Sequence, residues 1–249
     1  MPAGYKVIGC GAQAHYKNYG SLLTAVFPTD KNTCVARAKD HMEIFPDPSV
    51  LDVWAVGLHD PGNMWDVHIW RNTSEVSSHP EMRASVPAEY VMTGGGAEVH
   101  WAGAGNLLTA SYPLSENTWQ AESKDHLRGD PAAITVSAIG IRPRDKSLPL
   151  PRIRHWVESS AKVSQPGHNV VLNSGYVMAS GGAKVNWRGQ GSLLTASYPS
   201  AEGNAWLGFG KDHGAPDPAT ITVYLIGIAK PNAPLFEPAA LEAFKAQGR

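Results

Sequence analysis

Short apolar runs and polar turns alternate along almost the whole chain. The runs are rich in Val, Ile, Thr, Tyr and Trp, and clusters of Gly, Pro, Asn and Asp separate them at close intervals, as is typical of β-strands. Over residues 97–101 apolar and polar side chains alternate, as they do in a half-buried strand. Residues 134–141 are almost continuously apolar, which indicates a strand covered on both faces. The pattern predicts an all-β chain.

The strand pattern occurs three times, with a period of about 85 residues. The block that begins at Tyr5 recurs at Tyr90 and Tyr176, and most positions are identical between residues 90–111 and 176–197. Each block leads through Leu-Leu-Thr-Ala and an aromatic-Pro pair to a Lys-Asp-His triplet, and then to an apolar run. This pattern predicts three homologous β-rich repeats, which we call segments 1, 2 and 3.

Three copies of an open β unit favour one compact domain in which each copy covers the edge strands of another. We expect pseudo-threefold packing, as a prism or as packed sandwiches. Segments 2 and 3 begin with an additional strand around Trp70 and Trp156, a part that segment 1 lacks. The tail starts with Pro and an acidic residue and has Gly248 near its end, which predicts a short C-terminal helix. The boundaries are 1–61, 62–146 and 147–232 for the segments and 233–249 for the tail.

Composition narrows the class of protein. The chain has 21 Lys and Arg against 22 Asp and Glu, so its charge gives no reason to expect a nucleic acid as partner. No apolar run approaches the roughly 20 residues that span a bilayer, and the N-terminus lacks the pattern of a signal peptide. We therefore expect a cytoplasmic protein, or a secreted one if a leader is removed. The two cysteines, Cys10 and Cys34, are too few for a disulfide framework, and two free thiols are favoured over a disulfide.

The Lys-Asp-His triplet is the sharpest candidate for a site. Its side chains combine donors with acceptors, which suits a polyhydroxylated ligand, and it ends in turn residues between two strands. Trp119 and Trp206 precede two of the triplets, and a Trp face can stack on a sugar ring, whereas segment 1 has Cys34 there. A scaffold role, with Asp capping a turn, is slightly favoured over ligand contact. The candidate ligand-binding residues are Lys39, Asp40, His41, Trp119, Lys124, Asp125, His126, Trp206, Lys211, Asp212 and His213.

Other readings of the same residues stay open. Around an axis, His41, His126 and His213 would meet as a zinc site, but no metal-ligand spacing supports this, so the sequence indicates no metal and no other cofactor. Gly-x-Ser-x-Gly is absent, which leaves nucleophilic catalysis with little support. Trp101, Trp187 and Tyr16 are expected in the core. The Gly-rich stretch 94–96 favours a role in backbone geometry over phosphate binding.

The leading functional hypothesis is a multivalent, lectin-like carbohydrate-binding protein with one shallow site per repeat. Several weak sites on one rigid body raise avidity, and thrice-repeated residues fit this better than they fit one asymmetric catalytic site. An enzyme with a single site at the axis or in segment 1 is the second hypothesis, and a structural or adhesive protein such as a fibre component is the third. The sequence leaves the oligomeric state open.

Overall fold

The computed structural model describes residues 1–41 and 47–230. Every regular element in this part of the chain is a β-strand, so the all-β prediction is confirmed, and no helix there is long and apolar enough to cross a membrane. The helix predicted over 233–249 lies outside the described residues. The strands are β1 (Tyr5–Ala14), β2 (Ser21–Asp30), β3 (Thr33–Asp40), β4 (Leu51–His59), β5 (Trp65–Thr73), β6 (Glu81–Ser85), β7 (Val91–His100), β8 (Asn106–Pro113), β9 (Thr118–Asp125), β10 (Ala133–Pro143), β11 (Ile153–Ser159), β12 (Gly167–Val171), β13 (Tyr176–Asn186), β14 (Leu193–Pro199), β15 (Ala205–Lys211) and β16 (Thr220–Ala229).

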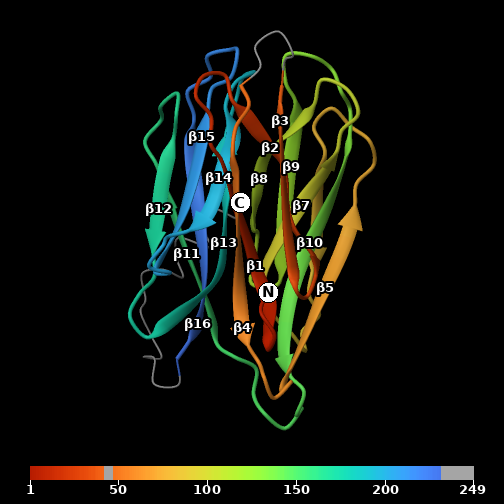
Figure 1. Ribbon diagram of the computed structural model, residues 1–249, viewed down its shortest axis with the longest axis vertical. Coiled ribbons are helices and arrows are strands. Elements are labelled where there is room, and N and C mark those ends of the chain that lie inside the picture. The colour runs from red at the N-terminus through yellow and green to blue at the C-terminus, as the bar shows by residue number, and fades with distance from the viewer. Residues whose placement is uncertain (42–46, 231–249) are drawn as a thin grey trace.

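The strands form three sheets, and each sheet combines strands from two segments (Figure 1). Sheet 1 has the order β12-β15-β14-β1-β4, sheet 2 the order β3-β2-β7-β10-β5, and sheet 3 the order β11-β16-β13-β8-β9-β6. The segments are joined where β1 pairs with β14, β2 with β7 and β8 with β13, each pair antiparallel. No segment therefore contains a complete sheet.

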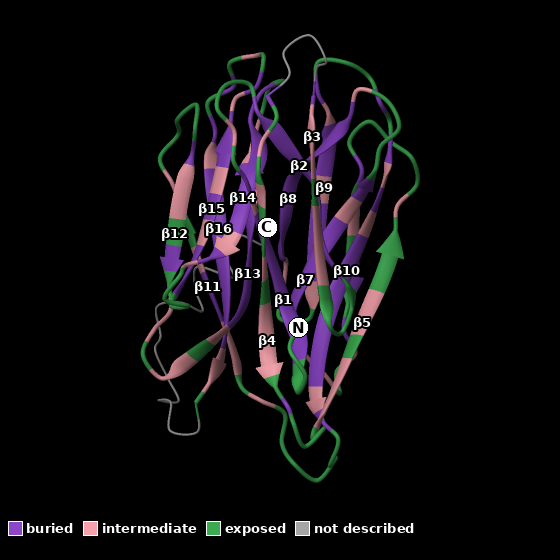
Figure 2. Ribbon diagram, in the orientation of Figure 1, coloured by how far each residue is buried: buried purple, intermediate pink, exposed green. Residues whose placement is uncertain are grey.

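The hydrophobic core lies between the three sheets. Edge strands of neighbouring sheets meet, β3 against β4, β5 against β6 and β11 against β12. Several strands between them, such as β8, are buried over most of their length (Figure 2). Val7, Ile139 and Leu225, one from each segment, are fully buried in a single cluster. Burial of each such side chain contributes about 1.5–3 kcal/mol, so the three segments stabilise one common core.

Two glycines make room for the largest core side chains. A Cβ atom at Gly95 would overlap the indole of Trp119, and one at Gly181 would overlap that of Trp206. Each pair joins two sheets, because Gly95 lies in β7 of sheet 2 and Trp119 in β9 of sheet 3. The close approach confirms the backbone role predicted for the glycine stretch, since only Gly permits it.

Segment 1 has a disulfide where the other segments have a Gly–Trp pair. Cys10 occupies the position of Gly95, Cys34 occupies that of Trp119, and the two cysteines are bonded with their Cα atoms 5.7 Å apart. The expectation of two free thiols was therefore wrong. The spacing along the chain could not show that β1 of sheet 1 and β3 of sheet 2 face each other across the core.

The Gly–Trp pair and the disulfide should be partly interchangeable. Cys34→Trp alone breaks the disulfide and forces an indole against the Cys10 side chain, so we expect a loss of about 4 kcal/mol in the free energy of unfolding. Cys10→Gly/Cys34→Trp should recover about 1–3 kcal/mol of this loss. Urea unfolding of both variants and of Cys10→Gly measures the difference. A double variant no more stable than Cys34→Trp would contradict this account.

Candidate functional site

The three Lys-Asp-His triplets lie at the ends of β3, β9 and β15, which belong to three different sheets. In each sheet the triplet lysine pairs with a leucine of the preceding strand. These leucines, Leu22, Leu107 and Leu193, are fully buried and pack together as one cluster. The packing of the leucines brings the three strand ends, and the histidines that follow them, to one place.

The histidines of the triplets form a compact cluster. His41, His126 and His213 are 4%, 1% and 3% exposed, and their ring centroids lie 4.7 to 5.1 Å apart. Each ring offers one nitrogen such that all three nitrogens lie within 4.8 Å of one another. Among the residues described, no other group of three His, Cys, Asp or Glu side chains meets in this way.

Both ring nitrogens of His126 lie beside carbonyl oxygens, an arrangement that a neutral imidazole cannot satisfy and that an additional positive charge would stabilise. Its Nδ1 lies 2.5 Å from the carbonyl oxygen of Gln190, and its Nε2 lies 2.6 Å from that of His213 and 3.0 Å from Nδ1 of His213. A neutral imidazole carries one N–H and can donate to one of these carbonyls only. The ring nitrogens of His41 have no hydrogen-bond partner within the described part of the chain.

A proton is an unfavourable way to supply that charge. Burial lowers the pKa of His41 to about 4 and that of His213 to about 3, and neighbouring histidines and lysines lower both further. Burial also lowers the pKa of His126. At neutral pH the three rings are therefore neutral, the form in which imidazole binds a metal ion.

The lysine of segment 2 holds a loop of segment 3. The ammonium of Lys124 donates to the carbonyl oxygens of Gly189, Gln190 and Gly191 at 3.3, 2.9 and 2.7 Å, and it lies 4.0 Å from the ring centroid of Trp187. Burial lowers the pKa of Lys124 to about 8, so the group remains mostly charged at pH 7. The carbonyls and the ring face replace its lost hydration.

The other two lysines make the same kind of contact. Lys211 of segment 3 donates to the carbonyls of Asn18 and Tyr19 at 2.6 and 2.8 Å and lies over the ring of Tyr16, and Lys39 of segment 1 donates to Gly103 at 2.8 Å. The ring under Lys39 is that of Trp101, at 3.8 Å. The lysines thus connect segments, and their ammonium groups are engaged within the protein.

The aspartates have structural roles as well. Asp125 accepts a hydrogen bond from the Asn106 amide at 2.9 Å, and Asp212 accepts one from the backbone N–H of Asp217 at 3.0 Å. Asp40 accepts in the same way from the backbone of Asp47.

A second aspartate follows each triplet, and sequence reasoning missed it. Asp130 accepts from the N–H of Gly103, Asp217 from that of Gly189, and Asp47 from those of Lys17 and Asn18. Each thereby fixes a loop that the triplet lysine of another segment holds. Its recurrence a few residues after Lys-Asp-His was the available signal.

Two predictions about aromatic residues were wrong. Trp119 and Trp206 are buried, and their indole N–H groups donate to Ser111 and Ser197 at 2.9 Å, so neither ring can stack on a sugar. Trp101, expected in the core, is 38% exposed. It follows the end of β7 and lies under Lys39. Trp119 and Trp206 were expected at the surface because each precedes a polar triplet. Which face of the strand points inward is decided by the tertiary structure.

Comparison with known proteins adds no assignment. No protein-family model matches this chain, and a search of curated proteins finds no match. Of the candidate residues, the structure brings together the three histidines and commits the lysines, aspartates and tryptophans to packing and loop contacts.

The buried lysine contact has a measurable consequence. Lys124→Met leaves three buried carbonyls without their donor, so we expect a loss of about 3 kcal/mol in the free energy of unfolding. Lys39→Met is the matched control, because Lys39 is only half-buried, and it should lose about 1 kcal/mol. Urea unfolding at pH 7 compares the two. Equal losses would show that burial of the ammonium does not determine the effect.

Proposed function

We propose that the three segments form a pseudo-threefold β-prism whose histidines bind one transition-metal ion on the axis. The recurring sequence blocks support this, as does the sharing of each sheet between two segments. The lysine contacts follow the same cycle, from segment 1 to 2, from 2 to 3 and from 3 to 1. In a closed arrangement of this kind, equivalent residues near the axis meet.

The meeting of three buried, neutral imidazoles is the observation that carries the proposal. Imidazole nitrogens suit Zn²⁺, Ni²⁺ and Cu²⁺, and tetrahedral zinc with Zn–N bonds of about 2.0–2.1 Å holds its ligand atoms about 3.3 Å apart. His126 Nε2 and His213 Nδ1 are 3.0 Å apart, so a rotation of the His41 ring completes the set. Donation from His126 Nδ1 to Gln190 selects the tautomer in which Nε2, beside the His213 carbonyl oxygen, carries the lone pair that binds the ion.

The buried position indicates that the ion stabilises the fold. The ion would join the ends of β3, β9 and β15, which lie in different sheets, and would supply the positive charge that the carbonyls and ring nitrogens lack. Because an ion that binds only the folded chain adds its binding free energy to folding, stability should depend on metal concentration.

Metal binding is tested on protein first treated with a chelator. Calorimetric titration with Zn²⁺, Ni²⁺ and Co²⁺ should show one ion per chain, and metal at 100 times its Kd should raise the free energy of unfolding by about 2.7 kcal/mol. His41→Ala should abolish the response while keeping the fold, because its ring nitrogens make no hydrogen bonds within the described residues. His100→Ala, an exposed histidine, is the control. Binding that persists in His41→Ala, or that is absent in the unaltered chain, would overturn the proposal.

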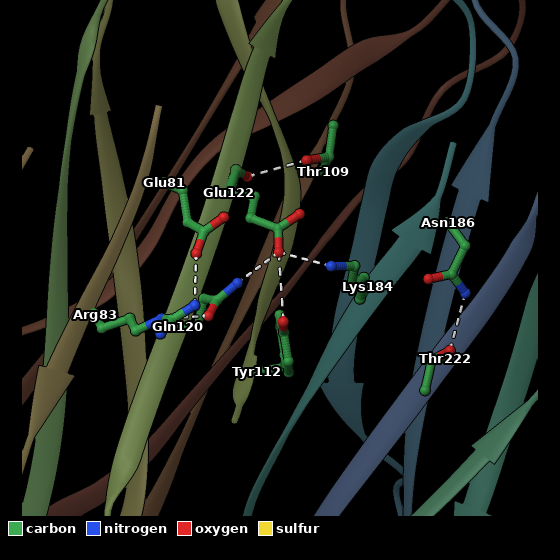
Figure 3. Close-up of polar contacts among 9 residues, drawn as sticks. All are labelled: Glu81, Arg83, Thr109, Tyr112, Gln120, Glu122, Lys184, Asn186 and Thr222. Atoms are coloured by element: carbon green, nitrogen blue, oxygen red, sulfur yellow. Dashed lines mark hydrogen bonds and ion pairs between the residues drawn. The ribbon is translucent and has the colours of Figure 1, made fainter. Parts of the chain in front are cut away.

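A second function, lectin-like binding of a carbohydrate, is favoured by a polar network on sheet 3 (Figure 3). There Glu122 accepts hydrogen bonds from Gln120 and Lys184, each at 2.7 Å, and Arg83 donates to Gln120 at 2.7 Å. Tyr112 lies beside this network, with its ring stacked on that of Tyr224. Gln120 and Tyr112 are buried, whereas the side chains of Lys184, Glu122 and Arg83 are 29%, 18% and 56% exposed. These exposed donors and the carboxylate acceptor suit the hydroxyl groups of a sugar.

A glycan array tests the second function. Binding to at least one glycan is expected, and Glu122→Gln should weaken it at least tenfold because the side chain loses its charge toward ligand hydroxyls. Glu202→Gln, an exposed carboxylate in a turn, should leave binding unchanged. If no glycan binds at high protein concentration, carbohydrate recognition by this network is excluded.

A further inference from the structure

Among the described residues, sheets 1 and 2 have five strands each and sheet 3 has six. In segments 2 and 3 the first two strands pair with later strands of the same segment, β5 with β10, β6 with β9, β11 with β16 and β12 with β15. Segment 1 has the corresponding β4 and β3, but within the described residues β4 pairs only with β1 and β3 only with β2. Because β3 contacts β4, both open edges lie at one corner of the molecule.

The leading strands of segments 2 and 3 are anchored by a tryptophan on a glycine. A Cβ atom at Gly140 would lie 2.8 Å from the ring of Trp70, which packs edge-on against Tyr90 with the ring centroids 4.8 Å apart. In segment 3, Trp156 lies over Gly227 and against Tyr176 in the same way.

Segment 1 has the same glycine and tyrosine without the tryptophan, and we call the space over this glycine the socket. Gly57 of β4 pairs with Val7, as Gly140 pairs with Met92 in segment 2, and Tyr5 stands beside it where segment 2 has Tyr90. The space over Gly57 is taken by the Met1 side chain. A flexible methionine is a replaceable occupant of such a space.

The edge of β4 also leaves apolar side chains uncovered. Val53 is 46% exposed, whereas Val136 at the equivalent place in β10 is fully buried. β10 has neighbours on both sides, β5 and β7, while β4 has a neighbour on one side only. An exposed apolar edge with unpaired N–H and C=O groups is a template for another strand.

We propose that the corner formed by β3 and β4 binds an extended segment of a partner polypeptide by strand addition, with a tryptophan of the partner replacing Met1 over Gly57. The partner segment pairs antiparallel with β4, turns, and adds a short second strand to β3, which gives sheets 1 and 2 the six-stranded form of sheet 3. Backbone hydrogen bonds supply affinity and the tryptophan supplies specificity.

A serine four residues after the tryptophan is the second recognition element. Ser74 and Ser160 each accept a hydrogen bond from the N–H of the first apolar residue of the neighbouring run, Ile134 or Ile221, at 3.0 Å. Leu51 holds this place in segment 1. A partner serine at the same spacing would accept from the N–H of Leu51.

A synthetic peptide with the sequence of residues 152–172 serves as the probe, because it contains β11, β12, Trp156 and Ser160. Calorimetry with the full chain should show one peptide bound per chain, and hydrogen exchange should show new protection of the β3 and β4 amides. A peptide with Trp156→Ala should bind at least tenfold more weakly. A protein variant without Met1 should bind at least tenfold more tightly, since its socket is open.

Gly57→Val fills the socket with a side chain and should abolish peptide binding, whereas Gly62→Ala, in the adjoining turn, should not affect it. Circular dichroism establishes that each variant is folded. The proposal is overturned if the peptide does not bind the variant without Met1, if Trp156→Ala binds equally well, or if the chain instead forms a dimer that Gly57→Val disrupts. The same measurements on chelator-treated protein and on protein with added Zn²⁺ keep this outcome separate from that of the metal proposal.

Discussion

Pairing of strands between segments is the interaction on which the other features depend. β1 pairs with β14, β2 with β7 and β8 with β13, so each sheet needs strands of two segments, and the set of three sheets needs all three segments. This pairing places the Gly–Trp contacts and the disulfide across sheet boundaries, and it gathers the triplet-bearing strand ends around one cluster of leucines. A segment folded alone would expose both the edges and the apolar faces of its strands.

The repeated triplet illustrates how one short motif divides its roles after folding. The lysines bind loop carbonyls of another segment and the aspartates fix turns, while the three histidines pack against one another and the ring nitrogens of His41 have no hydrogen-bond partner among the described residues. Burying a cationic side chain is costly unless it is fully coordinated. Of the two buried lysines, Lys124 and Lys211, Lys124 with three carbonyls and a ring face meets that condition best. The proposed metal ion would supply a partner to the ring nitrogens of His41.

Segment 1 departs from the other two in two linked ways. It holds a disulfide in place of a Gly–Trp pair, and in the part of the chain that the structure describes no leading strands cover its β3 and β4 as they cover their counterparts. The disulfide attaches β3 to β1, so the strand with the open edge is covalently held on its inner side.

The sequence alone determined the strand content, the recurring blocks and the need for small residues at the glycine stretch, because these depend on local side-chain pattern and backbone sterics. It also singled out every histidine of the cluster, although it favoured no metal there. Only the tertiary structure decided which face of each strand points inward, so Trp119 proved to be core and Trp101 to be surface. It likewise decided that Cys10 meets Cys34 and that the histidines converge. These outcomes depend on pairing between residues far apart in the chain, and no local pattern encodes which strand lies beside which.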